Sequence, residues 1–481
     1  MRDYCELNHA FRALSSRYYR PRSLLSLKDG NLFYLTDRIM VLLQRIIDQF
    51  RHLYQGSFAR SATGTFGLKV SLIALSFITS ILLARTLDVT GYGLYSYIMA
   101  WVMLLQIPAG LGLQTILARE LAAYRGKSEW GLMQGILQWS NIFVLAVSVI
   151  VSVIAVICVW VFQGQEMLQT NIAFGLAFLS LPLMTLTGLR MGAMRGLDKV
   201  VEGQLPEGLV QPLLFIAMLL FIVFLGSDSL TWVIGVRVIA MAFAFCLGAF
   251  LLYRNIPLAV KTSTPTYEVK RWLSGIPPFM LITVTHAINN RTDAIMLGAI
   301  AGTDAVAIYT VAHRGSQLVN FALVAINMSL GPRIVRLYQR GDMEELQRII
   351  TKSNRALFVV SLAISLVLVV FGRYFLLLFG SDFTRGSLPL IILVIGQLIN
   401  AFCGSSGVLL SMTGNERDSA TGIGLSAILN IFLNASLIPR FQAEGAAVAT
   451  TASLVFWNIF LLIRVRQRLG IAPTALGRFG N

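Results

Sequence analysis

The chain has 481 residues, of which 56% are hydrophobic and only 13% are charged. Soluble proteins have about a quarter of their residues charged, so this composition excludes an ordinary soluble enzyme and indicates a membrane protein. The net charge of +16 would suit a nucleic-acid-binding protein. The placement of the basic residues along the chain explains the charge differently, and we expect no nucleic-acid partner.

The first 60 residues are predicted to form a basic cytoplasmic extension. They contain no apolar segment of the length found in a cleavable signal peptide. Between Asn31 and Gln55, apolar residues recur at helical spacing from Leu32 to Phe50, with Arg38 and other charged residues between them. This pattern predicts an amphipathic helix lying on the inner membrane surface. A translation start at Met40 is an alternative explanation of this extension.

Twelve apolar segments follow, each long enough to cross a membrane. They lack the alternation of apolar and polar residues that barrel strands have, so we expect helices. The predicted spans are about 66–85, 95–116, 140–162, 171–191, 208–226 and 230–252, and then 275–300, 305–329, 356–379, 387–410, 419–438 and 444–464. They predict an N-terminal six-helix lobe at 65–253, a polar cytoplasmic linker at 254–271, a C-terminal lobe at 272–467 and a cytoplasmic tail at 468–481.

The two groups of six carry the same pattern. Three residues of the first half recur 214 positions later: Tyr95 as Tyr309, Arg119 as Arg333 and Tyr124 as Tyr338. Such duplication is typical of transporters whose pathway runs between two halves. The sequence therefore predicts an all-α polytopic membrane protein with two six-helix lobes forming an internal repeat around a central cavity.

Lysine and arginine residues set the orientation of the predicted helices. If the N-terminus is cytoplasmic, the inner connections and the C-terminal tail carry 21 basic residues, with Arg190 counted among them, whereas the outer connections carry 4. Basic residues collect on the cytoplasmic side of membrane proteins. We therefore predict that both termini are cytoplasmic, and the net charge needs no nucleic acid to explain it.

Charged residues inside the spans are candidates for function because burying charge in a membrane is costly. Arg237, Arg291 and Arg314 fall at a similar depth in the sixth, seventh and eighth spans. Together they would line one cationic cavity, with Lys69 near its inner mouth. The alternative is that each arginine satisfies backbone carbonyl groups at a helix break or pairs with Asp293.

Uncharged polar residues accompany these arginines. His286, Asn290 and Asp293 share one face of the seventh span, and Arg291 does not share it with Asp293. A second polar row occupies the eighth span, with members His313, Gln317 and Asn320. The two histidines suit proton transfer and hydrogen-bonded packing equally well.

Enzyme chemistry is not indicated by any motif. The four cysteines have neither metal-ligand nor disulfide-framework spacing. No nucleophile–base pair, metal cluster or phosphate-binding loop can be recognised in the sequence. We therefore expect no enzymatic activity, no cofactor and no metal centre.

Two segments resemble the bacterial polysaccharide flippases of the Wzx type. They are Leu82-Leu-Ala-Arg-Thr-Leu-Asp-Val-Thr-Gly-Tyr-Gly-Leu-Tyr95, and Asn290-Arg-Thr-Asp293 with Met296-Leu-Gly298. The resemblance covers about residues 62–468 and extends to the superfamily that includes lipid II flippases and multidrug extruders. It implies two lobes that open alternately and move an undecaprenyl-diphosphate-linked oligosaccharide to the outer leaflet of the bacterial inner membrane.

The resemblance also implies roles for residues and partners. The diphosphate and acidic sugars are expected to meet Arg291 and Arg314, then Arg237 and Lys69, with Asn290, Gln317 and Asn320 completing the predicted substrate-binding set. Asp293 is the expected site of a coupling proton or cation, together with His286 and His313. Glycosyltransferases and a polymerase of the same pathway are the expected partners.

Three alternatives remain. A cation-coupled multidrug extruder of the same fold would favour acidic residues in its cavity, whereas this chain has three intramembrane arginines to one aspartate. A major-facilitator sugar carrier would have a characteristic loop after the second span, which is missing from Leu117–Gly126. A polymerase or ligase would have a long outer loop, and no outer connection here exceeds about ten residues.

Overall fold

The computed structural model describes residues 57–163, 168–226 and 229–477. The side chains at 57–70, 162–163, 278–279, 281–290, 325 and 328 are not described. Residues Thr65–Asn481 form one compact unit, which contains nearly all of the described helices. The amphipathic helix predicted at Asn31–Gln55 lies outside the described residues.

All regular elements of the described residues are helical. The first half contains α3 (Ser57–Gly110), α4 (Leu113–Lys127), α5 (Trp130–Gln163), α6 (Leu168–Leu179), α7 (Leu181–Gly196), α8 (Val200–Leu205), a π-helical turn (Pro206–Val210), α9 (Gln211–Phe224) and α10 (Leu230–Asn255). The short helices α11 (Leu258–Thr262) and α12 (Val269–Ser274) follow. The second half contains α13 (Ile276–Ile300), α14 (Thr303–Gln339), α15 (Met343–Leu377), a 3-10 turn (Ser381–Gly386), α16 (Ser387–Cys403), α17 (Ser406–Met412) and α18 (Glu416–Leu469).

Eight helices of the described residues are long and apolar enough to cross a membrane, or nine if the bent α14 is included. Two of them, α3 and α18, have 54 residues each, far more than the roughly 20 that one crossing needs. Each contains a break where the backbone leaves helical geometry, at Asp88 (φ 55°) and Gln442 (φ 45°). These breaks separate predicted neighbouring spans. The protein is an all-α, multi-pass membrane protein, and its element order is consistent with the predicted twelve membrane crossings in two lobes.

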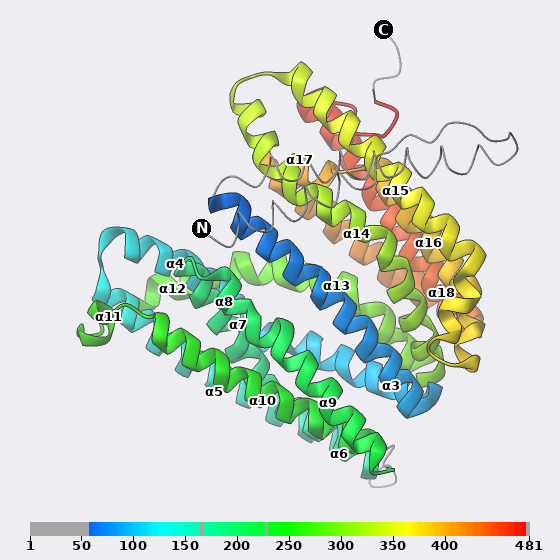
Figure 1. The fold of residues 1–481 in the computed structure, drawn as a ribbon, viewed down its shortest axis with the longest axis horizontal. Helices are drawn as coiled ribbons and strands as arrows, with labels where there is room; N and C mark the ends of the chain where they lie inside the picture. The colour runs from blue at the N-terminus through cyan, green and yellow to red at the C-terminus, as the bar shows by residue number, and fades with distance from the viewer. Residues whose placement is uncertain (1–56, 164–167, 227–228, 478–481) are drawn as a thin grey trace, which may run out of the picture. The chain divides into compact units, whose positions relative to one another are not determined.

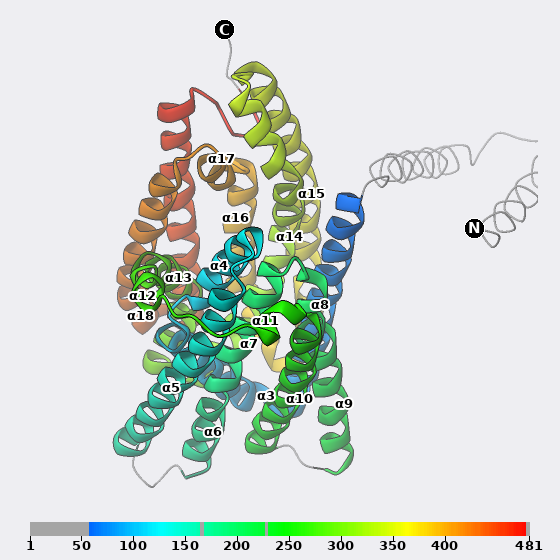
Figure 2. The ribbon, with the colours of Figure 1, turned by 90° about the vertical axis from the view of Figure 1, so that its left-hand side faces the viewer.

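The apolar core is continuous at one end of the helices and divided at the other. Near the break in α3 and the junction of α13 with α14, buried residues of both lobes form one cluster that includes Tyr92, Leu297 and Phe383. At the opposite end there are two clusters. One around Leu117 packs the N-terminal lobe against the linker and the start of α13, with Trp272 and Ile276 as members, and another around Ile334 lies within the C-terminal lobe. We call these the hairpin end and the basic end. Figure 1 shows α5–α10 grouped apart from α14–α18, with α3 and α13 between them, and Figure 2 shows the same groups from the side.

Repeat-related residues meet at the hairpin end. Thr90 donates a hydrogen bond to Asp304 over 2.8 Å, and these residues are 214 positions apart, which is the offset of the repeat. A Cβ atom on Gly93 would lie 1.9 Å from the backbone oxygen of Thr303. The close approach of the two hairpins therefore requires glycine at position 93.

The end of the chain returns to the C-terminal lobe after α18. Arg355 of α15 donates to the backbone oxygen of Ala475 over 3.0 Å, and the backbone nitrogen of Ala475 donates to the oxygen of Phe402. Residues 470–477 therefore pack against α15 and the end of α16. These contacts satisfy backbone groups that follow the last turn of α18.

The structure corrects the position predicted for Arg190. The sequence analysis counted it with an inner connection, because it stands at the end of the span predicted at 171–191, but the side chain is buried within the N-terminal lobe. It forms an ion pair with Glu207, which lies in the π-helical turn before α9. Gly248 of α10 makes room for it, because a Cβ atom there would be 2.3 Å from the guanidinium carbon.

Replacing Arg190 with Met should destabilise the protein by about 3–5 kcal/mol, because Glu207 would be left as an unpaired buried charge. Replacing both Arg190 and Glu207 with Met should restore most of the loss, since no charge then remains to be solvated. Denaturant unfolding of the purified protein in detergent micelles measures both effects. A double variant as unstable as the Arg190→Met variant would contradict the assignment of this ion pair.

Candidate functional site

Asp293 of α13 is a buried carboxylate surrounded by uncharged donors. Its exposed fraction is 5%. Tyr309 and Thr450 donate to Oδ2 over 2.6 and 2.9 Å, and Asn434 and Asn430 donate to Oδ1 over 2.6 and 3.1 Å. Both carboxylate oxygens therefore accept two hydrogen bonds. Among the described residues, no ion pair involves Asp293.

Two helices, α14 and α18, bring these donors to Asp293 of α13. Asn430 and Asn434 are one turn apart in the first part of α18, so both amides lie on the face toward α13. The break at Gln442 turns the chain, and Thr450 approaches the same carboxylate from the second part of α18. Tyr309 comes from α14 and also lies 2.9 Å from the hydroxyl of Thr450. The carboxylate thus ties together α13, α14 and both parts of α18.

Arg291 and Arg314 form a second feature, separate from the donors around Asp293. They lie on the consecutive helices α13 and α14, which pack against each other. Arg314 also donates to the hydroxyl of Ser76 in α3 over 3.1 Å, which is a contact between the lobes. Within the described residues, neither arginine has an ion-pair partner. As the helical spacing predicted, Arg291 does not neutralise Asp293.

Arg237 has its own partners in the N-terminal lobe. It donates to the hydroxyl of Tyr95 over 2.7 Å, and its guanidinium carbon lies 5.8 Å from the ring centres of Tyr95 and Phe215. Tyr95 and Tyr309 are repeat-related, so the same tyrosine position contacts an arginine in one lobe and an aspartate in the other. The side chains of Lys69, His286 and Asn290 lie outside the described residues.

The polar row of α14 lines a cavity beside Asp293. His313 stacks on Tyr309 with 5.7 Å between ring centres, Gln317 lies 3.2 Å from His313, and Asn320 donates to Gln317 over 3.3 Å. The cavity measures about 250 Å³. Its lining also includes Gln397, Asn400, Ser426, Asn430, Thr450, Ser453 and Trp457. Two of the donors to Asp293 are therefore part of the cavity wall.

This arrangement can hold a proton or a small cation. The carboxylate is buried and has no fixed positive partner among the described residues, and hard cations bind to oxygen ligands. Asn434 Oδ1 is also buried and accepts no hydrogen bond from the described residues. Transition-metal chemistry has no such support, since the described residues contain no group of three His, Cys, Asp or Glu side chains.

Sequence reasoning did not include Tyr309, Asn430, Asn434 or Thr450 among the site residues. A local signal was present, because Ser426, Asn430 and Asn434 recur every four residues within the apolar span predicted at 419–438. Such spacing marks one polar face of a helix. It does not indicate which carboxylate that face meets.

A Tyr309→Phe substitution should destabilise the protein by about 1–3 kcal/mol, because Asp293 loses a donor that water cannot replace in the buried site. In an Asp293→Leu background the same substitution should have a much smaller effect. Tyr95→Phe is the matched control, since the repeat-related tyrosine contacts Arg237 instead. Unfolding measurements on the double-mutant cycle test this, and equal losses from Tyr309→Phe in both backgrounds would refute it.

Comparison with known proteins shows the family. Residues 58–338 match the family described as "Polysaccharide biosynthesis protein", and residues 278–436 match the MatE family. A probable flippase of Haloferax volcanii is 26% identical over 292 residues, which are 59% of each chain, so the match spans less than two thirds of that relative. A probable low-salt glycan biosynthesis flippase of the same organism is 24% identical over 82% of this chain and 80% of its own.

Solved structures share the fold. An inward-facing multidrug resistance MATE family transporter has a TM-score of 0.70 at 14% identity, covering 83% of this chain and 94% of its own. The lipid II flippase MurJ in an inward closed conformation has a TM-score of 0.65 at 14% identity, covering 84% and 87%. Because the first family match covers more than half of the sequence, this chain belongs to the polysaccharide biosynthesis protein family, as the resemblance of its motifs predicted.

Proposed function

We propose that this protein is a flippase that moves a lipid-linked oligosaccharide across the membrane by alternating access. The cargo is an oligosaccharide on undecaprenyl diphosphate, used to build a surface polysaccharide such as lipopolysaccharide O-antigen, capsule or exopolysaccharide. The observation that carries this proposal is the presence of Arg291 and Arg314 within membrane-spanning helices, without ion-pair partners among the described residues. The family match and the flippase names of the relatives support it.

The chemistry of the two arginines favours an anionic cargo. A guanidinium group binds phosphate through paired N–H donors and keeps its charge in an apolar environment. Two guanidinium groups on adjacent helices, without ion-pair partners among the described residues, provide positive charge that a diphosphate would neutralise. Gln317 and Asn320 on the neighbouring face of α14, with Asn290, would donate to sugar hydroxyl groups. Arg237 and Lys69 complete the proposed binding set.

The proposed route of the cargo follows from how the apolar core is divided between the two lobes. The lobes share one apolar cluster at the hairpin end, whereas at the basic end only the start of α13 joins the N-terminal cluster and the rest of the C-terminal lobe has a cluster of its own. We assign the basic end to the cytoplasm, because basic residues collect on that side. In this proposal the structure represents a state open toward the cytoplasm, from which the cargo enters. In the other state the hairpin end separates, and the cargo leaves into the outer leaflet of the bacterial inner membrane.

Asp293 is the proposed coupling group. Binding or release of a proton or cation would change the charge on a carboxylate that connects α13, α14 and both parts of α18. His313, which stacks on the donor Tyr309, and His286 would assist proton movement. A change in the charge of Asp293 would weaken or strengthen the connection between these helices, and this links ion binding to the conformation of the C-terminal lobe.

Arg291→Ala and Arg314→Ala should each abolish polysaccharide export while the protein remains in the membrane, because the diphosphate loses its counter-charge. Arg373→Ala is the control, since this arginine is exposed near the hairpin end of α15 and is not part of the proposed binding set. Surface polysaccharide and the leaflet position of the lipid-linked oligosaccharide are measured in the native host. Cargo should accumulate on the cytoplasmic leaflet, and full surface polysaccharide from both variants would exclude the proposed binding role.

The same labelling separates the alternatives. Complete repeat units that accumulate on the outer leaflet in a deletion strain would place the protein after translocation, as a polymerase or ligase. Unchanged lipid intermediates combined with increased drug sensitivity would indicate a multidrug extruder.

A Gly93→Ala substitution should prevent full closure of the hairpin end, because its Cβ atom would overlap the backbone of Thr303. The expected result is a lower yield of cross-linking between cysteines placed at positions 90 and 304, which are in contact when this end is closed. Gly235→Ala is the control, since its Cβ atom would meet nothing within 4 Å. Unchanged cross-linking in the Gly93→Ala variant would contradict the role of this end as a gate.

A further inference from the structure

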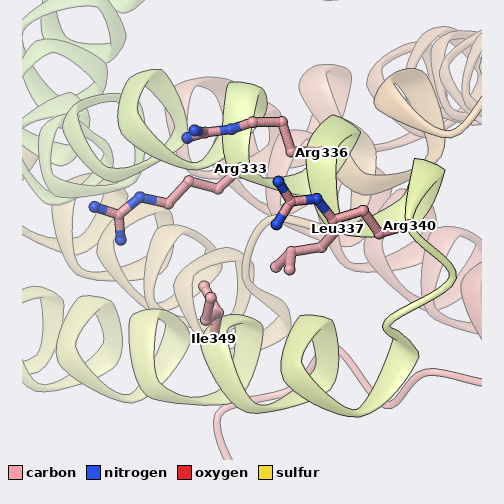
Figure 3. A pocket seen from close by; sticks show the side chains of 5 residues that line it. All are labelled: Arg333, Arg336, Leu337, Arg340 and Ile349. Carbon is pink, nitrogen blue, oxygen red and sulfur yellow. The ribbon is translucent and has the colours of Figure 1, made fainter.

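Three arginines stand together at the basic end of α14. Arg333, Arg336 and Arg340 surround a cavity of about 210 Å³, whose remaining lining residues are Leu337 of α14 and Ile349 of α15 (Figure 3). All three arginines are exposed. We call this set the arginine patch. It combines three guanidinium groups with an aliphatic floor.

The positive charge of the patch is not compensated within the described protein. None of its arginines forms an ion pair there, and the one side-chain hydrogen bond given for the set within the described residues is from Arg336 to the backbone oxygen of Pro332 over 3.3 Å. Arg348, on the adjacent helix, pairs instead with Glu345. The patch therefore has the capacity to bind an anion from outside the chain.

The repeat provides an internal comparison. Arg119 is the N-terminal counterpart of Arg333, and it is followed by the buried Glu120, which accepts from Arg119 over 2.8 Å and from Arg271 over 3.1 Å. The position equivalent to Glu120 is Ile334, which is fully buried. Membrane topology favours basic residues at this end of both lobes. Only the C-terminal copy lacks the carboxylate that neutralises them.

The aliphatic residue at the base of the patch, Ile349, lies on the same face of α15 as residues that face lipid. Val360 and Val367 lie three and five helical turns beyond Ile349, so all three share one face of α15. The two valines are 47% and 56% exposed, and α15 is one of the membrane-spanning helices. The aliphatic floor thus continues as the face that α15 turns toward lipid. No described residue lines both the patch and the polar cavity beside Asp293.

We propose that the arginine patch binds the phosphate headgroup of an anionic phospholipid in the leaflet at the basic end, with an acyl chain along the exposed face of α15. Basic pockets between membrane helices on the cytoplasmic side bind such headgroups. The floor of the patch shares a face of α15 with the exposed Val360 and Val367, and the patch shares no described lining residue with the interior polar cavity. A membrane lipid fits this arrangement better than the cargo does. The bound lipid neutralises the end of α14, the helix that carries Tyr309 and Arg314.

The test compares two triple variants of the full chain. Arg333→Gln/Arg336→Gln/Arg340→Gln removes the patch, and Lys127→Gln/Arg195→Gln/Arg254→Gln removes the same charge from exposed residues at the same end of the N-terminal lobe. Native mass spectrometry of each protein in neutral detergent follows binding of phosphatidylglycerol, with phosphatidylcholine of the same acyl chains as reference. Affinity for phosphatidylglycerol should fall at least about tenfold in the patch variant and remain near wild type in the control.

A second variant keeps the arginines in place. Ile349→Glu puts a carboxylate beneath the guanidinium groups, as Glu120 does in the other lobe, and should reduce phosphatidylglycerol binding to the same extent. Equal losses in both triple variants would reduce the effect to general charge attraction and overturn the proposal. Undecaprenyl diphosphate is titrated in parallel. Loss of its binding in the patch variants with phosphatidylglycerol binding retained would also overturn the proposal, by making the patch part of the cargo route.

Discussion

A carboxylate buried among membrane-spanning helices must find hydrogen-bond donors within the protein, because lipid offers none. Asp293 meets this requirement with uncharged donors from α14 and from both parts of α18. The packing of the C-terminal lobe depends on this arrangement, since one side chain connects three helices. The absence of a guanidinium partner in the described residues leaves the negative charge available for a proton or cation. The Asp293 carboxylate therefore has both a structural role and the proposed coupling role.

The two lobes have diverged at equivalent positions. Tyr95 accepts a hydrogen bond from Arg237, whereas Tyr309 donates one to Asp293. A phenol group can do both, because its oxygen is a donor and an acceptor. Opposite charges are thereby held at related places in the two lobes. At the basic end the lobes differ in whether the arginines are neutralised. Buried Glu120 pairs with Arg119 and Arg271. The equivalent position in the C-terminal lobe is the apolar Ile334.

The arginines of this chain have different environments and, in our proposals, different ligands. Arg190 is paired with Glu207 inside the N-terminal lobe, where it serves packing. Arg291 and Arg314 lie in the spans without carboxylate partners among the described residues and suit a cargo diphosphate. Arg333 and its neighbours lie at the helix ends beside a lipid-facing surface. Burial and available partners, more than residue type, separate these roles.

The sequence alone determined the features that depend on local pattern. Apolar runs predicted the twelve spans and the repeat predicted the two lobes, because a span is recognisable from its own residues. The separation of Arg291 from Asp293 followed from the rotation of about 100° per residue in a helix. The motif resemblance identified the family.

Only the tertiary structure decided which distant residues meet. Asn430 and Thr450 reach Asp293 across 137 and 157 positions, and no periodicity in the sequence indicates these pairs. Their meeting depends on how α13 packs against α18 and on the break at Gln442. Arg190 was counted with an inner connection because it stands at the end of the span predicted at 171–191, and its partner Glu207 lies just outside the span predicted at 208–226. Contacts of this kind depend on helix packing across the lobe, which a local pattern does not contain.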